Sequence, residues 1–388
     1  MSNLLVQDYL RSGKSLKDLE VEHGVYSFIS NGKISLNYDQ LEASGTDQLA
    51  CQCRGLILRE STYDIVACPF FRFFNYGEGH AAKINFDDCK IITKVDGTMA
   101  CVYFDHVMNK WCMGTRSRAD ANQKIDSFDY TFSDLIDIAS KKVILDDSEK
   151  NLQGLMKNAY KHFTYVFELT TPYNQVVVNR KDFNLHFLGM RDNVSLVEKD
   201  PETELHLFSH TSVKTPKAYN FSSLDEVIAF VKAIKPNEVE EYEGVVVVDS
   251  KFNRIKIKND AYNFSNGLRD SIQKSKRSCV AIILRDQVDD LVGKIPDIIL
   301  EDLFKMKDKV KDLFIKIHHE YESIKDIENQ KEFASLAKTK TWPGMMFSSR
   351  KLKSNLKEII LSDLDENKNI KKAHIDNILL LTGYSVID

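Results

Sequence analysis

The chain has 388 residues, enough for two or three domains of about 150 residues each and for at least one large hydrophobic core. Hydrophobic residues make up 43%, charged residues make up 28%, and the formal net charge is −4. This composition is typical of globular proteins and excludes a globally basic protein that coats nucleic acid, although it allows local basic patches. The longest apolar stretches, such as Cys279–Leu284, are far too short to span a bilayer, and the N-terminus has no signal-type apolar core. We therefore expect a cytoplasmic protein.

Short strands are predicted between about residue 25 and residue 260. Runs of four to six residues rich in β-branched and aromatic side chains recur there. Helical patterns interrupt them at Phe128–Lys142 and at Ser222–Ile234, where Ser222 or Ser223 is a suitable N-cap. The predicted strands are Cys53–Leu58, Ile91–Lys94, Ala100–Phe104, Tyr165–Leu169, Leu185–Met190, Gly244–Val248 and Arg254–Lys258.

After about residue 262 the pattern becomes helical. One amphipathic helix is predicted from apolar residues spaced by three, four or seven positions, namely Leu303, Met306, Val310, Leu313, Ile317 and Ile324. Further helices are predicted over Lys351–Leu364 and Ile370–Leu381. We expect an α+β protein, with a mixed α/β domain of antiparallel sheets over residues 1–262 and an all-helical domain over residues 263–388.

The seven cysteines are an odd number in a chain without an export signal, which predicts reduced and mostly buried thiols rather than disulfides. Cys51-x-Cys53 has a spacing found in some metal sites. No second pair of Cys or His residues follows at a zinc-finger spacing, so no zinc is expected.

The motif Lys94-x-Asp96-Gly97 stands between two predicted strands. Taken alone it is ambiguous, because Asp-Gly between strands is also the strongest short signal of a β-hairpin. A second feature is the run Arg254–Lys258, in which the strand period of two places three basic side chains on one face and Ile255 and Ile257 on the other. Such a row can hold a polyphosphate, but an ordinary solvated or edge strand has the same pattern.

These motifs belong to a larger ordered set, which resembles the covalent nucleotidyltransferase superfamily of polynucleotide ligases and capping enzymes. Within it, the set is most similar to the tRNA-repair type of ATP-dependent RNA ligase, the RNA ligase 1 family of the T-even phages. The resemblance is dense over residues 30–262 and thin in the helical tail. The residues that carry it are Arg54-Gly55, Arg72 with Phe74 and Asn75, Lys94-x-Asp96-Gly97, Glu168, Phe187 with Arg191, Glu243-Gly244, and Lys256 with Lys258.

The resemblance implies a chemistry that begins at Lys94. In this family the strand lysine attacks the α-phosphate of ATP, with Mg²⁺ or Mn²⁺, and forms a lysyl–AMP intermediate. The AMP then passes to an RNA 5′-phosphate, and an RNA 3′-hydroxyl displaces it. A free lysine amine has a pKa of about 10.4, so the site must favour the neutral amine. Neighbouring cations such as Lys256 and Lys258 act in that direction.

The resemblance also implies roles for other residues. Those implied to bind ATP are Tyr38, Arg54, Arg72, Glu168, Glu243, Lys256 and Lys258, and the phage family has lysine where this chain has Arg72. Arg116, Asp96, Gly97 and Tyr262 match further functional positions. Tyr38 and Tyr262 are equally compatible with packing roles. Phe187 is more typical of a core strand and is not assigned to the site.

In the tail, Asp289 and Asp290 match an aspartate pair linked to magnesium in the family, although adjacent aspartates on a helix are usually solvated. Two basic patches, Asp249–Val280 and Arg350–Lys357, suit RNA phosphates but equally suit solvated helix faces. The missing strand pattern argues against the C-terminal OB barrel of DNA ligases and capping enzymes.

We therefore expect an ATP-dependent RNA ligase whose tail selects RNA, most simply a cleaved tRNA anticodon loop, without a membrane or an obligate protein partner. Two alternatives stay open. One is a GTP-dependent capping or DNA-sealing enzyme, and the other is a non-catalytic RNA-binding or tRNA-binding protein that retains the fold.

Overall fold

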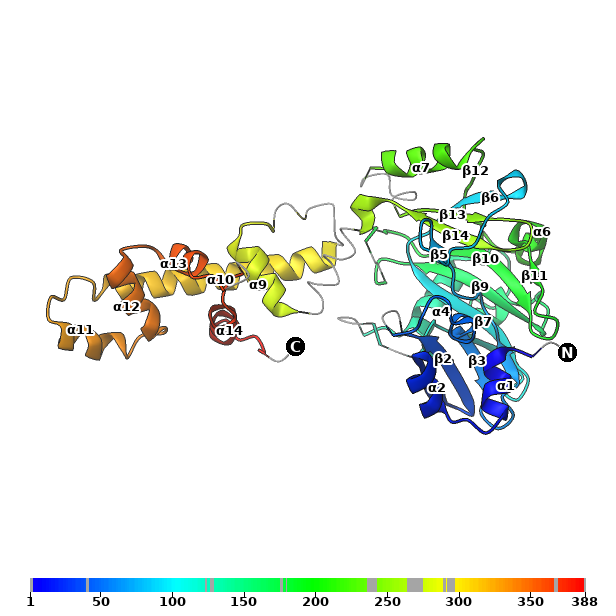
Figure 1. Ribbon diagram of the computed structural model, residues 1–388, viewed down its shortest axis with the longest axis horizontal. Helices are drawn as coiled ribbons and strands as arrows, with labels where there is room; N and C mark the ends of the chain where they lie inside the picture. The colour runs from blue at the N-terminus through cyan, green and yellow to red at the C-terminus, as the bar shows by residue number, and fades with distance from the viewer. Residues whose placement is uncertain are drawn as a thin grey trace. The chain divides into compact units, whose positions relative to one another are not determined.

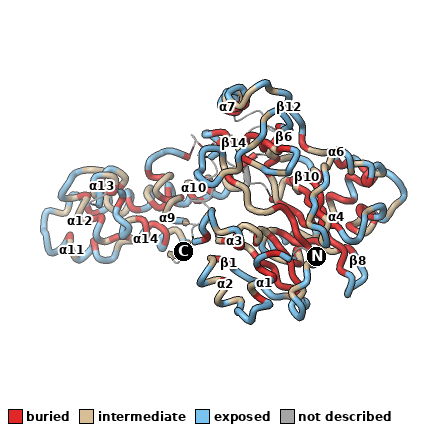
Figure 2. Tube along the Cα trace, turned by 45° about the vertical axis from the view of Figure 1, so that its right-hand side comes forward, coloured by how far each residue is buried: buried red, intermediate tan, exposed pale blue. Residues whose placement is uncertain are grey.

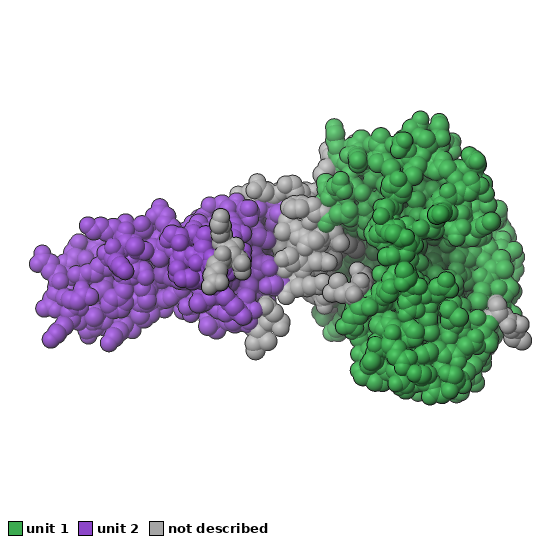
Figure 3. All heavy atoms as spheres, viewed as in Figure 1, with its two compact units in different colours: residues 1–263 green, residues 264–388 purple. Residues whose placement is uncertain are grey.

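The computed structural model divides the chain into two compact units, unit 1 (Met1–Asn263) and unit 2 (Phe264–Asp388) (Figures 1 and 3). The structure describes residues 3–39, 42–122, 124–125, 129–174, 177–178, 180–235, 243–263, 275–288, 291, 297–365 and 369–386. Within these ranges no helix has both the length and the apolar character needed to cross a membrane. All seven cysteines are free thiols, and four of them are buried.

Three sheets form the framework of unit 1. Sheet A has the strand order β1-β2-β3-β4, sheet B has the order β12-β6-β13-β14-β5, and sheet C has the order β11-β10-β9-β7-β8. Neighbouring strands run antiparallel except β14 and β5, which are parallel. The strands are β1 (Val25–Ser30), β2 (Lys33–Tyr38), β3 (Arg54–Arg59), β4 (Ile65–Ala67), β5 (Phe74–Asn75), β6 (Lys90–Thr93), β7 (Thr98–Asp105), β8 (Lys110–Gly114), β9 (Phe163–Thr170), β10 (Asn184–Asp192), β11 (Glu198–Lys199), β12 (Ala218–Tyr219), β13 (Gly244–Val248) and β14 (Arg254–Lys258).

Most helices of unit 1 begin at residues whose side chains cap them. The hydroxyl of Ser223 accepts a hydrogen bond from the backbone of α7, and Thr131 and Ser15 each form a capping box at the start of α4 and α2. The helices are α1 (Leu5–Arg11), α2 (Leu16–His23), α3 (Gln48–Gln52), η1 (Phe86–Asp88), α4 (Phe132–Val143), α5 (Leu152–Leu155), α6 (Pro201–Glu204), η2 (Leu205–Phe208) and α7 (Leu224–Ala233).

Each sheet of unit 1 has a helix packed on it, and the buried residues form separate clusters. Figure 2 marks the buried segments in red. Leu10 of α1 packs on sheet A, Leu135 of α4 on sheet C, and Val231 of α7 on sheet B. Phe187 is fully buried in the cluster below α4, so it is a core residue. The half-buried face of β14, which carries Lys256 and Lys258, supplies part of the candidate site.

Unit 2 has a core made by helices. The expected stripe on the long helix is confirmed, because the side chains of Leu303, Met306, Val310, Leu313 and Ile317 are all buried. The helices are α9 (Lys276–Leu284), α10 (Asp297–Glu322), α11 (Gln330–Ala337), α12 (Pro343–Leu352), α13 (Leu356–Ser362) and α14 (Lys372–Leu381). The described part of unit 2 contains one isolated β-bridge and otherwise helices and turns.

The predicted fold class, α+β followed by a helical region, is confirmed. The single helix predicted over Lys351–Leu364 is wrong, because two helices meet there. Lys353 has a left-handed backbone (φ 52°) that ends α12, and Asn355 forms a capping box with Glu358 that begins α13.

Candidate active site

Lys94 lies where the chain passes from one sheet to another. It follows β6, which pairs with β12 and β13 in sheet B, and it precedes β7, which pairs with β8 and β9 in sheet C. The hairpin interpretation of Asp96-Gly97 is therefore wrong, because β6 and β7 do not pair with each other. The crossing places the Lys94 side chain next to residues from both sheets.

Glu243 is the direct partner of Lys94. Its Oε1 atom lies 2.6 Å from the Lys94 Nζ and 3.0 Å from the Lys258 Nζ, and the Glu243 side chain is only 4% exposed. Main-chain bonds hold the pair in register, since the Lys94 amide donates to the Gly244 carbonyl at 2.8 Å and the Asn259 amide donates to the Glu243 carbonyl at 3.0 Å. One carboxylate oxygen therefore stands between two ammonium groups.

The carboxylates around Lys94 decide its protonation in this state. Burial by itself disfavours the ammonium, but Glu243 and Glu168 outweigh it, so the pKa of Lys94 is raised. Burial and the charge of Glu243 raise the pKa of Glu168 to about 8, although Lys94 opposes them. In this state the site holds Lys94 as a cation and Glu168 largely as a neutral acid at pH 7.

Gly97 and Asp96 fix the crossing in place. A Cβ atom on Gly97 would lie 2.6 Å from the carbonyl oxygen of Leu169 on β9, so a side chain does not fit there. Asp96 is 4% exposed, and its carboxylate accepts hydrogen bonds from the amides of Val177 (2.9 Å) and Val178 (2.7 Å) and from the Tyr262 hydroxyl (2.8 Å). Asp96 thus ties the turn after Lys94 to two distant segments.

Lys256 and Lys258 share the half-buried face of β14, while Ile255 and Ile257 are buried on the other face. Arg254 stands on the same side as the lysines, but its Nη2 is bound to Glu198 at 2.6 Å. Burial, followed by the charges of Lys258 and Lys94, lowers the pKa of Lys256 to about 7. Within this row, Lys258 shares Glu243 with Lys94 and Lys256 senses the charge of Lys94, whereas Arg254 is paired with Glu198.

Arg54 and Phe73 extend the site. The Arg54 guanidinium lies 5.4 Å from the centre of the Phe73 ring, and the Lys256 Nζ lies 5.1 Å from the same ring. Burial and the nearby Arg116 lower the pKa of Arg54 to about 10. Phe73 was not predicted, although a signal existed: Phe73 and Phe74 are adjacent in an extended segment, so one of the two rings must point away from the core.

Tyr38 lies between two arginines. The guanidinium carbons of Arg72 and Arg116 lie 4.3 Å and 4.6 Å from the centre of its ring. Arg116 donates from Nε to Asn37 at 3.0 Å, and Arg72 donates from Nη1 to the Ala43 carbonyl at 2.9 Å. Stacking against a buried ring holds both guanidinium groups in fixed positions.

The structure thus brings most of the predicted residues into one region of unit 1. Tyr262 is 2% exposed and contributes to this region through Asp96. Asp289 and Asp290 lie outside the described residues. The charge count is uneven, because three arginines and three lysines surround a few acids, which suits a polyanionic ligand. The residues concerned are Tyr38, Arg54, Arg72, Lys94, Asp96, Gly97, Arg116, Glu168, Glu243, Lys256, Lys258 and Tyr262.

The donors present also fit a hard divalent cation. Across the described ranges no cluster of three or more His, Cys, Asp or Glu side chains is arranged to hold a metal. Mg²⁺, however, commonly takes only one or two carboxylates and completes its shell with water and substrate phosphates. Glu243 and Glu168 can provide those carboxylates, whereas the oxygens of Asp96 are already occupied by three donors.

Comparison with known proteins gives three findings. The profile of a family described as RNA ligase matches residues 52–262. A bifunctional polynucleotide kinase/RNA ligase, itself a provisional assignment, from Autographa californica nuclear polyhedrosis virus is 26% identical over 372 residues, covering 92% of this chain and 50% of the viral protein. An RNA ligase of Rhodothermus phage RM378 is 24% identical over 329 residues, covering 72% of this chain and 73% of the phage protein.

This chain spans about half the length of the baculovirus relative. Among solved structures, an archaeal ATP-dependent RNA ligase is similar with a TM-score of 0.43 and 12% identity, covering 69% of this chain and 67% of that one. Similarity at this level does not indicate function.

Proposed function

Because the chain belongs to the RNA ligase family, we propose that it is an ATP-dependent ligase that joins an RNA 5′-phosphate to an RNA 3′-hydroxyl through a covalent AMP on Lys94. The observation that carries the proposal is the contact of Lys94 with Glu243, which also binds Lys258. A lysine beside a buried carboxylate, surrounded by cations, is suited to meet the triphosphate of ATP.

In the first step the neutral Lys94 Nζ attacks the α-phosphorus of ATP. An N–P bond forms, the bond from the α-phosphorus to the bridging oxygen breaks, and pyrophosphate leaves with the electron pair. As the N–P bond forms, the attacking amine releases one proton to water and keeps its other N–H in the phosphoramidate. In this state Glu243 favours the ammonium form, so Lys94 becomes a nucleophile only when Glu243 takes another partner. A divalent cation, Mg²⁺ or Mn²⁺, held by Glu243 and Glu168 would supply positive charge beside the α-phosphate.

Different basic residues of the site bind different phosphates of ATP in this proposal. In this proposal Lys256 and Lys258 contact the departing phosphates, and the planar guanidinium groups of Arg54, Arg72 and Arg116 bind phosphate oxygens. In the second step an oxygen of the RNA 5′-phosphate attacks the same phosphorus, the N–P bond breaks, and Lys94 recovers its proton. In the third step the 3′-hydroxyl oxygen attacks the RNA 5′-phosphorus and releases its proton to water. A phosphodiester P–O bond forms, the P–O bond to the bridging oxygen breaks, and AMP leaves with that oxygen and the electron pair.

The decisive experiment is incubation with ATP or GTP labelled at the α-phosphate, with Mg²⁺, followed by denaturing electrophoresis. We expect an AMP adduct that Lys94→Ala abolishes and that the control Lys90→Ala retains, since Lys90 is an exposed lysine at the start of β6, the strand that precedes Lys94. Lys94→Ala should still join RNA supplied with an adenylylated 5′ end. A GMP adduct would favour a capping enzyme, no adduct would favour a binding protein, and an adduct that survives Lys94→Ala would refute the role of Lys94.

We further propose that the enzyme repairs broken RNA in the cytoplasm and that unit 2 favours a cleaved tRNA anticodon loop. The argument is the basic patch of α12 and α13, which has four lysine or arginine residues and no acid over residues 350–357. The test compares kcat/KM for a nicked anticodon stem-loop and for an unstructured RNA of equal length. Equal values would refute the preference.

A further inference from the structure

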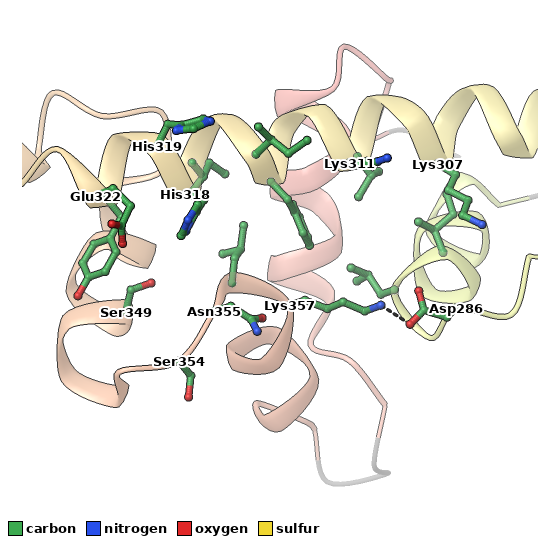
Figure 4. A pocket seen from close by; sticks show the side chains of 18 of the residues that line it. Asp286, Lys307, Lys311, His318, His319, Glu322, Ser349, Ser354, Asn355 and Lys357 are labelled. Carbon is green, nitrogen blue, oxygen red and sulfur yellow. Dashed lines mark hydrogen bonds and ion pairs between the residues drawn. The ribbon is translucent and has the colours of Figure 1, made fainter. Parts of the chain in front are cut away.

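A deep groove lies within unit 2, away from the residues assigned to ATP. It encloses about 880 Å³ between α10 and the segment that runs from the end of α12 into α13 (Figure 4). The volume is within the range of roughly 300–1,000 Å³ that encloses small organic ligands.

The floor of the groove is apolar and carries an aromatic ring. Leu284, Val310 and Ile317 are buried members of the unit 2 core, and they line the groove together with the half-buried Phe314. Ile315 on the same helix is 46% exposed. A flat, weakly polar molecule could therefore cover the Phe314 side chain and remain in contact with the core.

The rim of the groove is basic. Lys307 and Lys311 stand one helical turn apart on α10, and Lys353 and Lys357 stand on the opposite wall. Lys357 is bound to Asp286, whereas neither Lys311 nor Lys353 forms an ion pair with any described residue. Figure 4 shows His318 pointing from α10 toward the segment that carries Asn355.

The charge of the groove is opposite to that of the chain. Four lysines and two carboxylates, Asp286 and Glu322, line it, which leaves a net charge of +2 with its histidines neutral. The whole chain has a net charge of −4. The groove is therefore a local anion-attracting site with an aromatic floor.

We propose that this groove binds an unpaired nucleotide of the RNA substrate, with the base against Phe314 and the flanking phosphates at Lys311 and Lys353. The inference rests on the proposed function, since it gives unit 2 the binding mode by which it would recognise RNA. Aromatic floors beside lysine rims bind single-stranded nucleic acid because every base has a stacking face and every linkage has a charge. Unpaired bases in loops are also the parts of an RNA that side chains can reach.

The test measures binding of the full chain to a fluorescein-labelled, unstructured 12-nucleotide RNA with a 5′-hydroxyl, which cannot accept AMP. Phe314→Leu keeps an apolar side chain but removes the ring, and we expect it to raise Kd about tenfold. Lys311→Glu should raise Kd by a similar factor and reduce the slope of log Kd against log salt by about 0.7 or more. Lys316→Glu, an exposed lysine of α10 outside the groove, should change Kd less than about twofold.

A ribose–phosphate chain without bases separates the two contributions. Phe314→Leu should leave Kd for this probe unchanged, while Lys311→Glu should still weaken binding. Equal loss with both probes would refute base stacking, and wild-type Kd values for both variants would refute the groove as an RNA site. Competition by polyglutamate that depends on Phe314 would assign the groove to an acidic protein, and similar competition by free ATP would assign it to a free nucleotide.

The assay is independent of the ligase chemistry. Formation of the AMP adduct without RNA should be the same as in the wild type for both groove variants and for the Lys316→Glu control. Absence of the AMP adduct in the wild type would refute the proposed function, and the binding assay could still be interpreted. Unchanged RNA binding in the groove variants would refute only the proposal that the groove binds RNA. Thermal midpoints within about 3 °C of the wild type, the shift that a small stability change produces, show that the variants are folded.

Discussion

The affinity of the site for ATP should depend on pH through Lys256. Burial and the charges of Lys258 and Lys94 lower the pKa of Lys256 to about 7, so the side chain is protonated below that pH and neutral above it. A triphosphate binds the charged form more tightly. Raising the pH above 7 should therefore weaken ATP binding, because Lys256 must take up a proton before it can bind the triphosphate tightly.

The size of the effect follows from the protonated fraction. With a pKa of about 7, Lys256 is about 24% protonated at pH 7.5 and about 1% protonated at pH 9.0. If only the protonated form binds, the apparent Kd rises in proportion to the lost fraction, by about 25-fold over this range. Glu168, with a pKa of about 8, loses its proton in the same window and also weakens binding.

Comparing the wild type with Lys256→Met isolates the contribution of Lys256 to the pH dependence of ATP binding. Calorimetric titration with α,β-methylene-ATP, which cannot form the adduct, gives Kd without metal, so that Glu243 keeps its contacts. The wild type should bind more tightly at pH 7.5 and converge on the Met variant at pH 9.0, while the slope that remains in the variant belongs to Glu168. Parallel curves for the two proteins would show that Lys256 keeps its charge and would refute the reasoning.

Two substitutions test the framework of the site. Gly97→Ala places a Cβ 2.6 Å from the Leu169 carbonyl oxygen. It should cost about 1–3 kcal/mol in urea unfolding and suppress the AMP adduct, and unchanged stability would contradict this packing. Gly344→Ala is the control, because the added Cβ would lie more than 4 Å from every atom beyond the neighbouring backbone of its own helix. Glu198→Gln removes the charge that joins Arg191 and Arg254 and should cost about 3–5 kcal/mol, against less than about 1 kcal/mol for the exposed Glu202→Gln. Equal midpoints for these two variants would mean that the buried bridge contributes nothing.

Periodic patterns in the sequence predicted the elements and the fold class. The alternation of Arg254–Lys258 and the stripe of α10 both report which side chains are buried, and burial dominates the local choice of structure. The break between α12 and α13 could also have been predicted, because Asn355 and Glu358 have the spacing of a capping box. The spacing of the apolar residues continues across this break, so that spacing alone predicts one helix instead of two.

The geometry of the candidate site could be predicted only in part. Turn chemistry favoured a hairpin at Asp96-Gly97, but pairing of β6 with β13 decided the path, and no local pattern reports pairing across more than 150 residues. For the same reason Glu198, which neutralises Arg254, has no signal in the sequence near β14. The roles of individual residues in catalysis stay predictions until the AMP adduct is tested.

The strand order of sheet B has a consequence for the timing of folding. The strand that leads to Lys94 pairs with β12 and β13, and β13 in turn pairs with β14, which ends at Lys258. At roughly 5–20 residues per second, a ribosome needs on the order of 8–30 s to extend the chain from Lys94 to Lys258. The nascent chain therefore carries its proposed nucleophile without Glu243 or either lysine of β14 for most of that time. A release of the chain before β14 is made would leave a sheet with exposed edges, so incomplete chains should aggregate rather than bind ATP.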